Sequence, residues 1–425
     1  MNSGKSLQLL ATAHNFQEKK IPFIILKSEI DDRDGIDVIH SRALGDRECV
    51  SIKSTTNLYK LIATLMALVM SIFGSLGLVG NVSDDYTEGK YKNVILLIGD
   101  GMSFNNLEAT KLYRTNGYLT METMPVKASS DIDSYSIPYT DSAAGGTALS
   151  TGIRVWSNSL GVYPFLPLVP DDIAVPINLC ELAKSRGMAA GVVTTDKTSG
   201  ATPSAFSAHV LNRNLEEEIS SDQLKSDLDL IWGAASESIN EENAADNGFT
   251  YINNETDMKA LKAGSKSFAQ FNGSDLKNVT NKNNTPTITE MTEKAIEILS
   301  ADEDGFFLMV EGACIDKFAH DNIMDGMTLS AQEFDKAVAA ALEFAKKDGE
   351  TLVVVTADHG TGRMRPDGNG GYKFTWGEHD FDDVPVFVSA EDAGFISGKE
   401  IKNRQIPVQI ARVLGFDASQ FPAQK

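Results

Sequence analysis

From residue 93 onward, short apolar runs alternate with amphipathic stretches. The apolar runs are NVILLIGDG, MAAGVVTTD, GFFLMVEG, TLVVVTADHG and VPVFVSA, and glycine or acidic residues flank them. Stretches between them, such as TEMTEKAIEIL and SAQEFDKAVAAALEFAKKDG, have helical periodicity. Continuous apolar strands that alternate with helices are typical of parallel sheets covered on both faces. The pattern therefore predicts an α/β protein with a doubly wound, largely parallel central sheet and helices on both of its faces.

The stretch from about 215 to 285 is more polar than its surroundings, and NGSDLKNVTNKNN within it is typical of a surface loop. We interpret this stretch as an elaboration of one domain that covers residues 84–425.

One uncharged segment, LIATLMALVMSIFGSLGLVGNVS, covers residues 61–83. It is long enough to span a bilayer, and its lysine-containing flank and small residues also fit a secretory signal. A buried core helix is less favoured, because the run has no polar stripe. We expect residues 59–83 to be a signal peptide or a membrane anchor, and the protein to be exported to the periplasm or the extracellular space. For the upstream segment 1–58, one hypothesis is that it is not part of the mature protein and that translation starts at Val50.

Charge and cysteine content narrow the choice of partners. The chain has 38 lysine and arginine residues against 59 acidic residues, a formal net charge of −21. This balance argues against a nucleic-acid-binding surface, which needs basic residues, but it is compatible with a small anionic substrate at a local positive site. The three cysteines, Cys49, Cys180 and Cys314, form no CxxC pair, so a thiolate zinc site is not expected. A disulfide between Cys180 and Cys314 is left open.

Three of the predicted strands lead into acidic residues, namely Asp100, Glu311 and Asp358, and His359 follows the last of these. In open α/β sheets the ligand site lies beyond the carboxyl ends of the strands. Each acid alone would more simply cap a helix or face solvent. Together they would bring several negative charges to one edge of the sheet, which needs a counter-charge, most simply a metal ion.

The histidines support a metal site. His320 follows Asp316 by four residues, so a helix would present both on one face, and His379 lies between two acidic residues in GEHD. Imidazoles combined with carboxylates and without thiolates are typical of hydrolytic zinc sites. His209 has no obvious acidic neighbour in the sequence, and we interpret it as structural.

The stretch YTDSAAGGTALSTG, residues 139–152, predicts a helix that begins at Ser142. The helix dipole and the free N–H groups of its first turn favour a negative oxygen there, and a bound metal would favour the alkoxide further. Small residues allow the backbone to come close to a substrate and metals. The simpler alternative is that Asp141 or Ser142 is only an N-cap. A Ser-His-Asp triad is disfavoured, because there is no GxSxG motif.

Six segments in this order resemble the alkaline phosphatase family and cover nearly everything from residue 93 to 379: NVILLIGDGM, YTDSAAGGTALSTG, VVTTDKTSGATPSAFSAHVLNR, LMVEGACIDKFAH, VVVTADHGTG and GEHD. The resemblance implies hydrolysis of small-molecule phosphate monoesters with broad specificity, through a phosphoserine intermediate at a site with two zinc ions and one magnesium ion. It also implies a homodimer. Ser142 matches the nucleophile, and Arg213 matches the arginine that binds the phosphoryl oxygens. The implied ligands are Asp316, His320 and His379 for one zinc, Asp100, Ser142, Asp358 and His359 for the other, and Asp100, Thr202 and Glu311 for magnesium.

The sequence departs from the family at Gly200. Family members often have an acidic residue or a histidine two places before the magnesium threonine. Because glycine has no side chain to hold the waters of the metal, we expect a weakly held magnesium and Lys317 without its acidic partner. The alternative is that another acid, such as Asp196, does the same job.

Two rival functions are a phosphodiesterase or phosphonate hydrolase of the same superfamily, and a non-catalytic phosphate-binding protein. The intact set of nucleophile and ligands, with Arg213 and Glu311 in their motifs, favours the monoesterase.

Overall fold

The computed structural model describes residues 89–416 except 133, 137–139, 164–174, 272–275 and 277–283, together with five short strands before residue 89. The chain divides into two compact units, Met1–Leu78 and Val79–Lys425. In the first unit, β1 (Leu26–Ser28) pairs in parallel with β4 (Val50–Ile52), and β2 (Val38–Ser41) pairs antiparallel with β3 (Gly45–Glu48).

The predicted signal or anchor segment lies outside the described residues, except that its end overlaps β5 (Val82–Tyr86). Among the helices that the structure describes, none is both long enough and apolar enough to cross a membrane.

A ten-stranded sheet organises the second unit. Its strand order is β10 (Thr250–Ile252), β11 (Ser267–Phe271), β9 (Leu230–Ala234), β8 (Ala189–Lys197), β12 (Phe306–Glu311), β6 (Asn93–Ile98), β13 (Thr351–Thr356), β18 (Val384–Val388), β7 (Val126–Asp131) and β20 (Glu400–Lys402). Neighbours are parallel, except that β18 is antiparallel to both β13 and β7. The five predicted apolar runs form β6, β8, β12, β13 and β18, so the prediction of a largely parallel sheet is confirmed.

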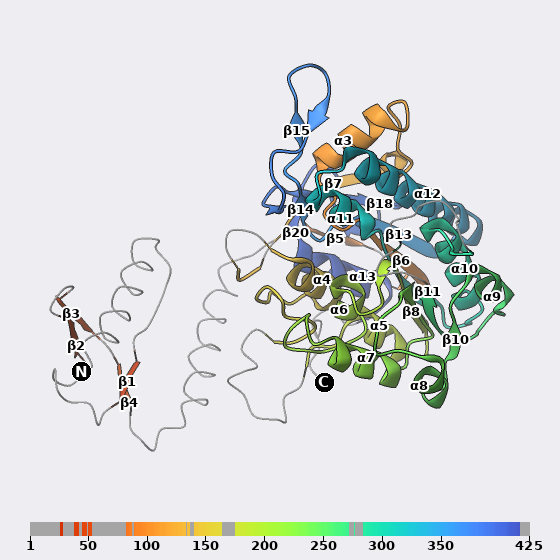
Figure 1. Ribbon diagram of the computed structural model, residues 1–425, viewed down its shortest axis with the longest axis horizontal. Helices are drawn as coiled ribbons and strands as arrows, with labels where there is room; N and C mark the ends of the chain where they lie inside the picture. Colours follow the sequence, from red (N-terminus) through yellow and green to blue (C-terminus); the bar gives the residue numbers. More distant parts are fainter. Residues whose placement is uncertain are drawn as a thin grey trace. The chain divides into compact units, whose positions relative to one another are not determined.

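Helices cover both faces of this sheet (Figure 1). One face packs against α4 (Ser142–Thr151), α5 (Leu179–Lys184), α6 (Ala201–Ala205), α7 (Glu216–Lys225), α8 (Glu241–Asp246) and α13 (Ile406–Val413). The other face packs against α3 (Phe104–Tyr113), α9 (Glu255–Ala260), α10 (Ile288–Leu299), α11 (Cys314–His320) and α12 (Met324–Asp348). The central strand β6 is buried on both faces, because Val94, Leu96 and Ile98 belong to one core and Ile95 and Leu97 to the other. This explains why its sequence is continuously apolar.

The polar stretch 215–285 is built into the sheet. It contributes α7, β9, α8, β10, α9 and β11, and every residue of β9 and β11 is buried. Most of the expected surface loop NGSDLKNVTNKNN lies outside the described residues. The stretch therefore extends the parallel sheet at one edge, and its polar residues come mainly from the helices that connect these strands.

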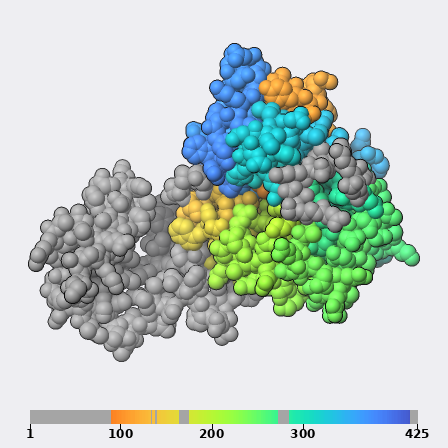
Figure 2. Space-filling model, viewed as in Figure 1, coloured from red at the N-terminus to blue at the C-terminus, as the bar shows by residue number. Residues whose placement is uncertain are grey.

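The remaining elements are short. They are the strand pairs β14 (Gly360–Thr361) with β17 (His379–Asp380), β15 (Arg365–Pro366) with β16 (Tyr372–Lys373) and β19 (Ala393–Phe395) with β5, and the 3-10 helices η1 (Met121–Thr123) and η3 (Asn403–Gln405). The β15–β16 hairpin leans on α3, where the Tyr113 hydroxyl accepts a hydrogen bond from the backbone of Tyr372, and Figure 2 shows the two segments side by side in blue and orange. Cys180 and Cys314 are both buried and neither is in a disulfide, so the disulfide left open above is not formed.

Candidate metal centre and active site

The acids at the strand ends converge, as the sequence predicts. Asp100 follows β6, Glu311 ends β12 and Asp358 follows β13, and these three strands are neighbours in the sheet. All three side chains are buried. Burial, together with the charges of neighbouring acids, raises the pKa of Asp358 to about 7 and that of Glu311 to about 8, and it raises the pKa of Asp100 well above its ordinary value. Cations nearby would favour the ionised forms of these carboxyl groups at neutral pH.

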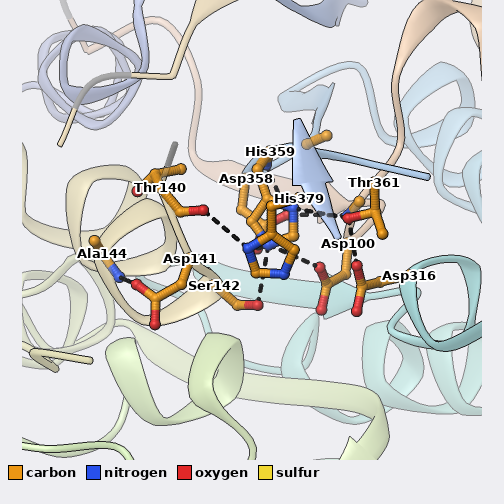
Figure 3. Close-up of polar contacts among 12 residues, drawn as sticks. Asp100, Thr140, Asp141, Ser142, Ala144, Asp316, Asp358, His359, Thr361 and His379 are labelled. Atoms are coloured by element: carbon orange, nitrogen blue, oxygen red, sulfur yellow. Dashed lines mark hydrogen bonds and ion pairs between the residues drawn. The ribbon is translucent and has the colours of Figure 1, made fainter. Parts of the chain in front are cut away.

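One cluster gathers around the ring of His359 (Figure 3). Its Nε2 atom lies 3.2 Å from Ser142 Oγ, 3.5 Å from Asp100 Oδ1 and 3.4 Å from Asp358 Oδ2. Those two carboxylate oxygens are buried and accept no hydrogen bond from any described residue. Burial, with the neighbouring histidines, holds the pKa of His359 well below its ordinary value, so the imidazole is neutral. A neutral imidazole beside unpaired carboxylate oxygens fits a divalent zinc ion.

A second cluster shares His359 with the first. Ligand atoms of Asp316, His359 and His379 all lie within 4.8 Å of one another. The resemblance implies His320 in place of His359 here, and His320 Nε2 indeed lies 3.4 Å from Asp316 Oδ2, with its ring 5.0 Å from that of His379. The structure therefore brings all the predicted zinc ligands together.

Backbone carbonyls orient the two outer histidines. Nδ1 of His320 lies 2.7 Å from the Gly377 carbonyl oxygen, and Nδ1 of His379 lies 2.9 Å from that of Thr140. If each Nδ1 donates its proton to the carbonyl, Nε2 is left as an acceptor for a metal. These two carbonyl contacts are consistent with both histidines as metal ligands.

The predicted helix start is confirmed at Ser142, which is the first residue of α4. Asp141 is the N-cap, and its Oδ1 accepts a hydrogen bond of 3.1 Å from the Ala144 amide. The capping interpretation therefore applies to Asp141, whereas the Ser142 hydroxyl faces His359.

Arg213 lies beside the same helix start. Its Nη1 is 3.3 Å from Asp141 Oδ2, which also accepts a hydrogen bond of 3.0 Å from the Asn158 amide. The Arg213 side chain is 30% exposed, so part of its guanidinium faces solvent while Asp141 restrains it.

The remaining predicted ligands, Glu311 and Thr202, mark a third candidate metal position. Thr194 donates a hydrogen bond to Glu311 Oε2. This bond and the nearby Thr202 hydroxyl oppose the upward shift of the Glu311 pKa. The Thr202 hydroxyl is buried, and among the described residues it has no hydrogen bond of normal geometry. A set of carboxylate and hydroxyl oxygens matches the ligand preference of magnesium.

The expectation that Lys317 lacks an acidic partner is wrong. Its Nζ lies 2.7 Å from Asp196 Oδ1, so the alternative that another acid takes this place is the one the structure supports.

Two contacts were not visible in the sequence. His209 Nε2 lies 3.0 Å from Glu181 Oε1, an acidic neighbour in α5, and His209 belongs to neither histidine cluster, which agrees with its structural interpretation. Thr361, which the sequence reasoning missed, donates a hydrogen bond of 2.6 Å to Asp316 Oδ1. Its place two residues after His359 in the DHGTG motif was the only available signal.

Comparison with known proteins identifies the family. The alkaline phosphatase family model matches residues 91–230 and 229–378, and a thymidine kinase family model matches residues 1–72. Alkaline phosphatase 4 of Bacillus subtilis (strain 168) is 30% identical over 347 residues, which cover 76% of this chain and 72% of that protein. Alkaline phosphatase of Escherichia coli (strain K12) is 30% identical over 345 residues, which cover 65% and 71% of the two chains.

Solved structures agree. Alkaline phosphatase from the Antarctic bacterium TAB5 has a TM-score of 0.66 and 29% identity, and the match covers 78% of this chain and 100% of that one. A histidine-to-glutamate variant of the TAB5 enzyme, with Mg bound in the M3 site, matches with the same TM-score of 0.66. The family model, the relatives and the clustered site residues agree, and this chain belongs to the alkaline phosphatase family of phosphoric monoester hydrolases.

Proposed function

We propose that the chain hydrolyses phosphate monoesters through a covalent phosphoserine on Ser142, at a site that binds two zinc ions and one magnesium ion. The observation that carries the proposal is the convergence of Ser142 Oγ and the carboxylates of Asp100 and Asp358 on Nε2 of His359, all within 3.5 Å. The Ser142 hydroxyl stands at a helix start beside two buried carboxylate oxygens that accept no hydrogen bond from the described residues, which supports its activation by a cation.

The residues present fit these metals. Zinc would be held by Asp316, His320 and His379 at one position and by Asp100, Asp358 and His359 at the other, and magnesium by Asp100, Thr202 and Glu311. When bound, the metals would act as Lewis acids that stabilise charge on the attacking and leaving oxygens. Support for magnesium at the oxygen-only position comes from the TAB5 variant, in which a glutamate replaces a histidine and Mg is bound in the M3 site.

The chain's own residues account for the transfer. Ser142 Oγ bonds to phosphorus as the bond between phosphorus and the ester oxygen breaks, and the proton lost by Ser142 ends on the leaving alcohol. Water then attacks the same phosphorus as the bond to Ser142 Oγ breaks, so that one proton of the water returns to Ser142 and its hydroxide remains on the released inorganic phosphate. The first-turn amides of α4 favour the negative serine oxygen. Arg213 would donate two hydrogen bonds to phosphoryl oxygens, because its guanidinium is a planar fork. Few of these contacts involve the alcohol, so broad specificity is expected.

A phosphodiesterase is the rival that shares this fold. Comparing hydrolysis of a simple aryl monoester with that of the matching diester separates the two functions. Trapping at acid pH, followed by peptide mapping, tests the intermediate, and label on Thr140 or Thr147 would overturn the assignment to Ser142. Both threonines are fully or almost fully buried, and Thr147 already donates to the Ser159 carbonyl.

Export and assembly belong to the same proposal. The apolar segment 61–83 supports export, and the alkaline phosphatase match, which begins at residue 91, supports treating residues 1–58 as distinct from the phosphatase domain. N-terminal sequencing of precursor and mature protein tests both points. A homodimer is expected from the family, and light scattering on the purified protein tests it.

A further inference from the structure

The carboxylate of Asp196 lies where a side chain on residue 200 would begin. A Cβ atom added to Gly200 would be 2.5 Å from Asp196 Oδ2 and 2.9 Å from the Lys197 carbonyl oxygen. The backbone of Gly200 has φ −58° and ψ 157°, which any residue can adopt. Glycine is therefore required at this position by the lack of space and not by the backbone conformation.

An irregularity in β8 brings Asp196 to this place. Val193 pairs with Trp232 of β9, but the next paired residues are Lys197 and Ala234, so β8 has extra residues between the two pairs. Such a bulge bends a strand and redirects its side chains. Gly233 leaves room for it, since a Cβ there would be 2.7 Å from the Asp196 carbonyl oxygen.

Asp196 is linked to the third metal position through Thr194. The Asp196 amide donates a hydrogen bond of 2.8 Å to Thr194 Oγ1, and Thr194 in turn donates to Glu311 Oε2. On its other side, Asp196 Oδ1 pairs with Lys317 at 2.7 Å. The Asp196 side chain is only 16% exposed, so this carboxylate is fixed between the Glu311 network and Lys317.

We propose that Asp196 supplies the carboxylate of the magnesium site that residue 200 cannot provide, with Lys317 as its ion-pair partner. This inference rests on the proposed function, in which Glu311 and Thr202 bind magnesium. Magnesium keeps several waters, and a carboxylate beside the site holds those waters. Asp196 is a positioning residue: it acts on the metal and its waters, not on the reacting atoms.

A consequence concerns Gly200→Asp. With Asp196 present, the new Cβ would collide with its carboxylate and with the Lys197 carbonyl group, so this change alone should weaken magnesium binding. In the double variant Asp196→Ala/Gly200→Asp, the collision with the Asp196 carboxylate is removed and the acid returns to position 200. Only the 2.9 Å approach to the Lys197 carbonyl oxygen remains. The two acids should therefore substitute for each other but not coexist.

The test is calorimetric titration of magnesium into the full chain loaded with zinc. We expect Asp196→Asn to raise the Kd for magnesium about 10- to 100-fold, the usual effect of losing a group that holds a metal ligand in place. The double variant should lie closer to wild type than Asp196→Asn does. The matched control, Asp227→Asn, removes an exposed acid and should leave the Kd unchanged.

An unchanged Kd in Asp196→Asn, or no magnesium binding by the zinc-loaded wild type, would overturn the proposal. Phosphoserine trapping on the same samples separates this result from the proposed function. If Ser142 is labelled with phosphate and Asp196→Asn has an unchanged Kd for magnesium, only the role of Asp196 is refuted. If no phosphoserine can be trapped in the wild type, the proposed function itself is refuted.

Discussion

Gly145 of α4 packs directly against the backbone of Asp358, because a Cβ atom on Gly145 would lie 2.7 Å from the Asp358 carbonyl oxygen. The small-residue stretch after Ser142 thus lets the helix that carries the proposed nucleophile approach the loop of Asp358 and His359, two proposed zinc ligands. Gly146 of the same helix packs against α6, where a Cβ atom on Gly146 would be 3.2 Å from Ala205 Cβ and 3.4 Å from Thr202 Cα.

Gly145→Ala should therefore separate Ser142 from the metal ligands. We expect kcat/KM to fall by at least about tenfold, since a misplacement of roughly 1 Å can cost up to about 100-fold. The loss of kcat/KM should be larger than a loss of stability can explain. Alanine forms helices better than glycine, so the substitution should not destabilise the helix itself. Steady-state kinetics and thermal unfolding of the variant test this. Gly146→Ala, with its longer contacts, should be milder, and equal losses in both variants would contradict the explanation.

Ser142→Ala should abolish the phosphoserine and reduce turnover strongly while the metal sites stay occupied. The capping hydrogen bonds of Asp141 do not involve the serine side chain, so the start of α4 should be preserved. Metal analysis after gel filtration should give wild-type zinc content, and some activity can persist because bound metals activate water. A variant that keeps wild-type turnover would show that Ser142 is not the nucleophile.

The sequence predicted the strands whose carboxyl ends carry the acidic residues of the site. Continuous apolar runs define β6, β12 and β13, and parallel strands with a common edge must bring Asp100, Glu311 and Asp358 together. The helix start at Ser142 was predictable from small residues and an acidic N-cap.

Asp196 could be foreseen only as an alternative. The direction of the Asp196 side chain depends on an irregularity in the pairing of β8 with β9. The local sequence does not reveal the register of these two strands. The acidic partner of His209 was hidden for a similar reason, since Glu181 lies in α5. Contacts set by tertiary packing are the ones that pattern analysis missed.

Arg213→Ala should weaken binding of the phosphoryl group by about 2–3 kcal/mol, the range for charge-assisted hydrogen bonds, or roughly 30- to 150-fold in kcat/KM. Inhibition by inorganic phosphate should weaken in parallel. Arg213→Lys retains the charge but loses the planar fork, so it should recover only part of the loss. Wild-type kcat/KM and phosphate inhibition in Arg213→Ala would remove Arg213 from the site.

The buried acids also predict how pH affects the metal-free protein. In the folded chain the pKa values of Asp358 and Glu311 are about 7 and about 8, raised mainly by burial above ordinary carboxyl values of about 4. At pH values between about 4 and about 8, these two carboxyl groups therefore bind more protons in the folded state than in the unfolded state. The stability that this provides is fully present below about pH 4 and is lost as the pH rises through the folded values.

Chelator-treated protein should therefore lose thermal stability as the pH rises from about 5 to about 8.5, and the protein with zinc and magnesium should not, because the cations favour the ionised carboxylates. The difference in Tm between the two forms should widen across this range. The net charge of −21 also destabilises the protein at high pH, so the comparison is made in about 0.5 M salt, which screens exposed charges more than buried ones. The double variant Asp358→Asn/Glu311→Gln should flatten the metal-free curve. A constant difference between the two forms, or an unaltered slope in the double variant, would show that these carboxyl groups do not control the pH response.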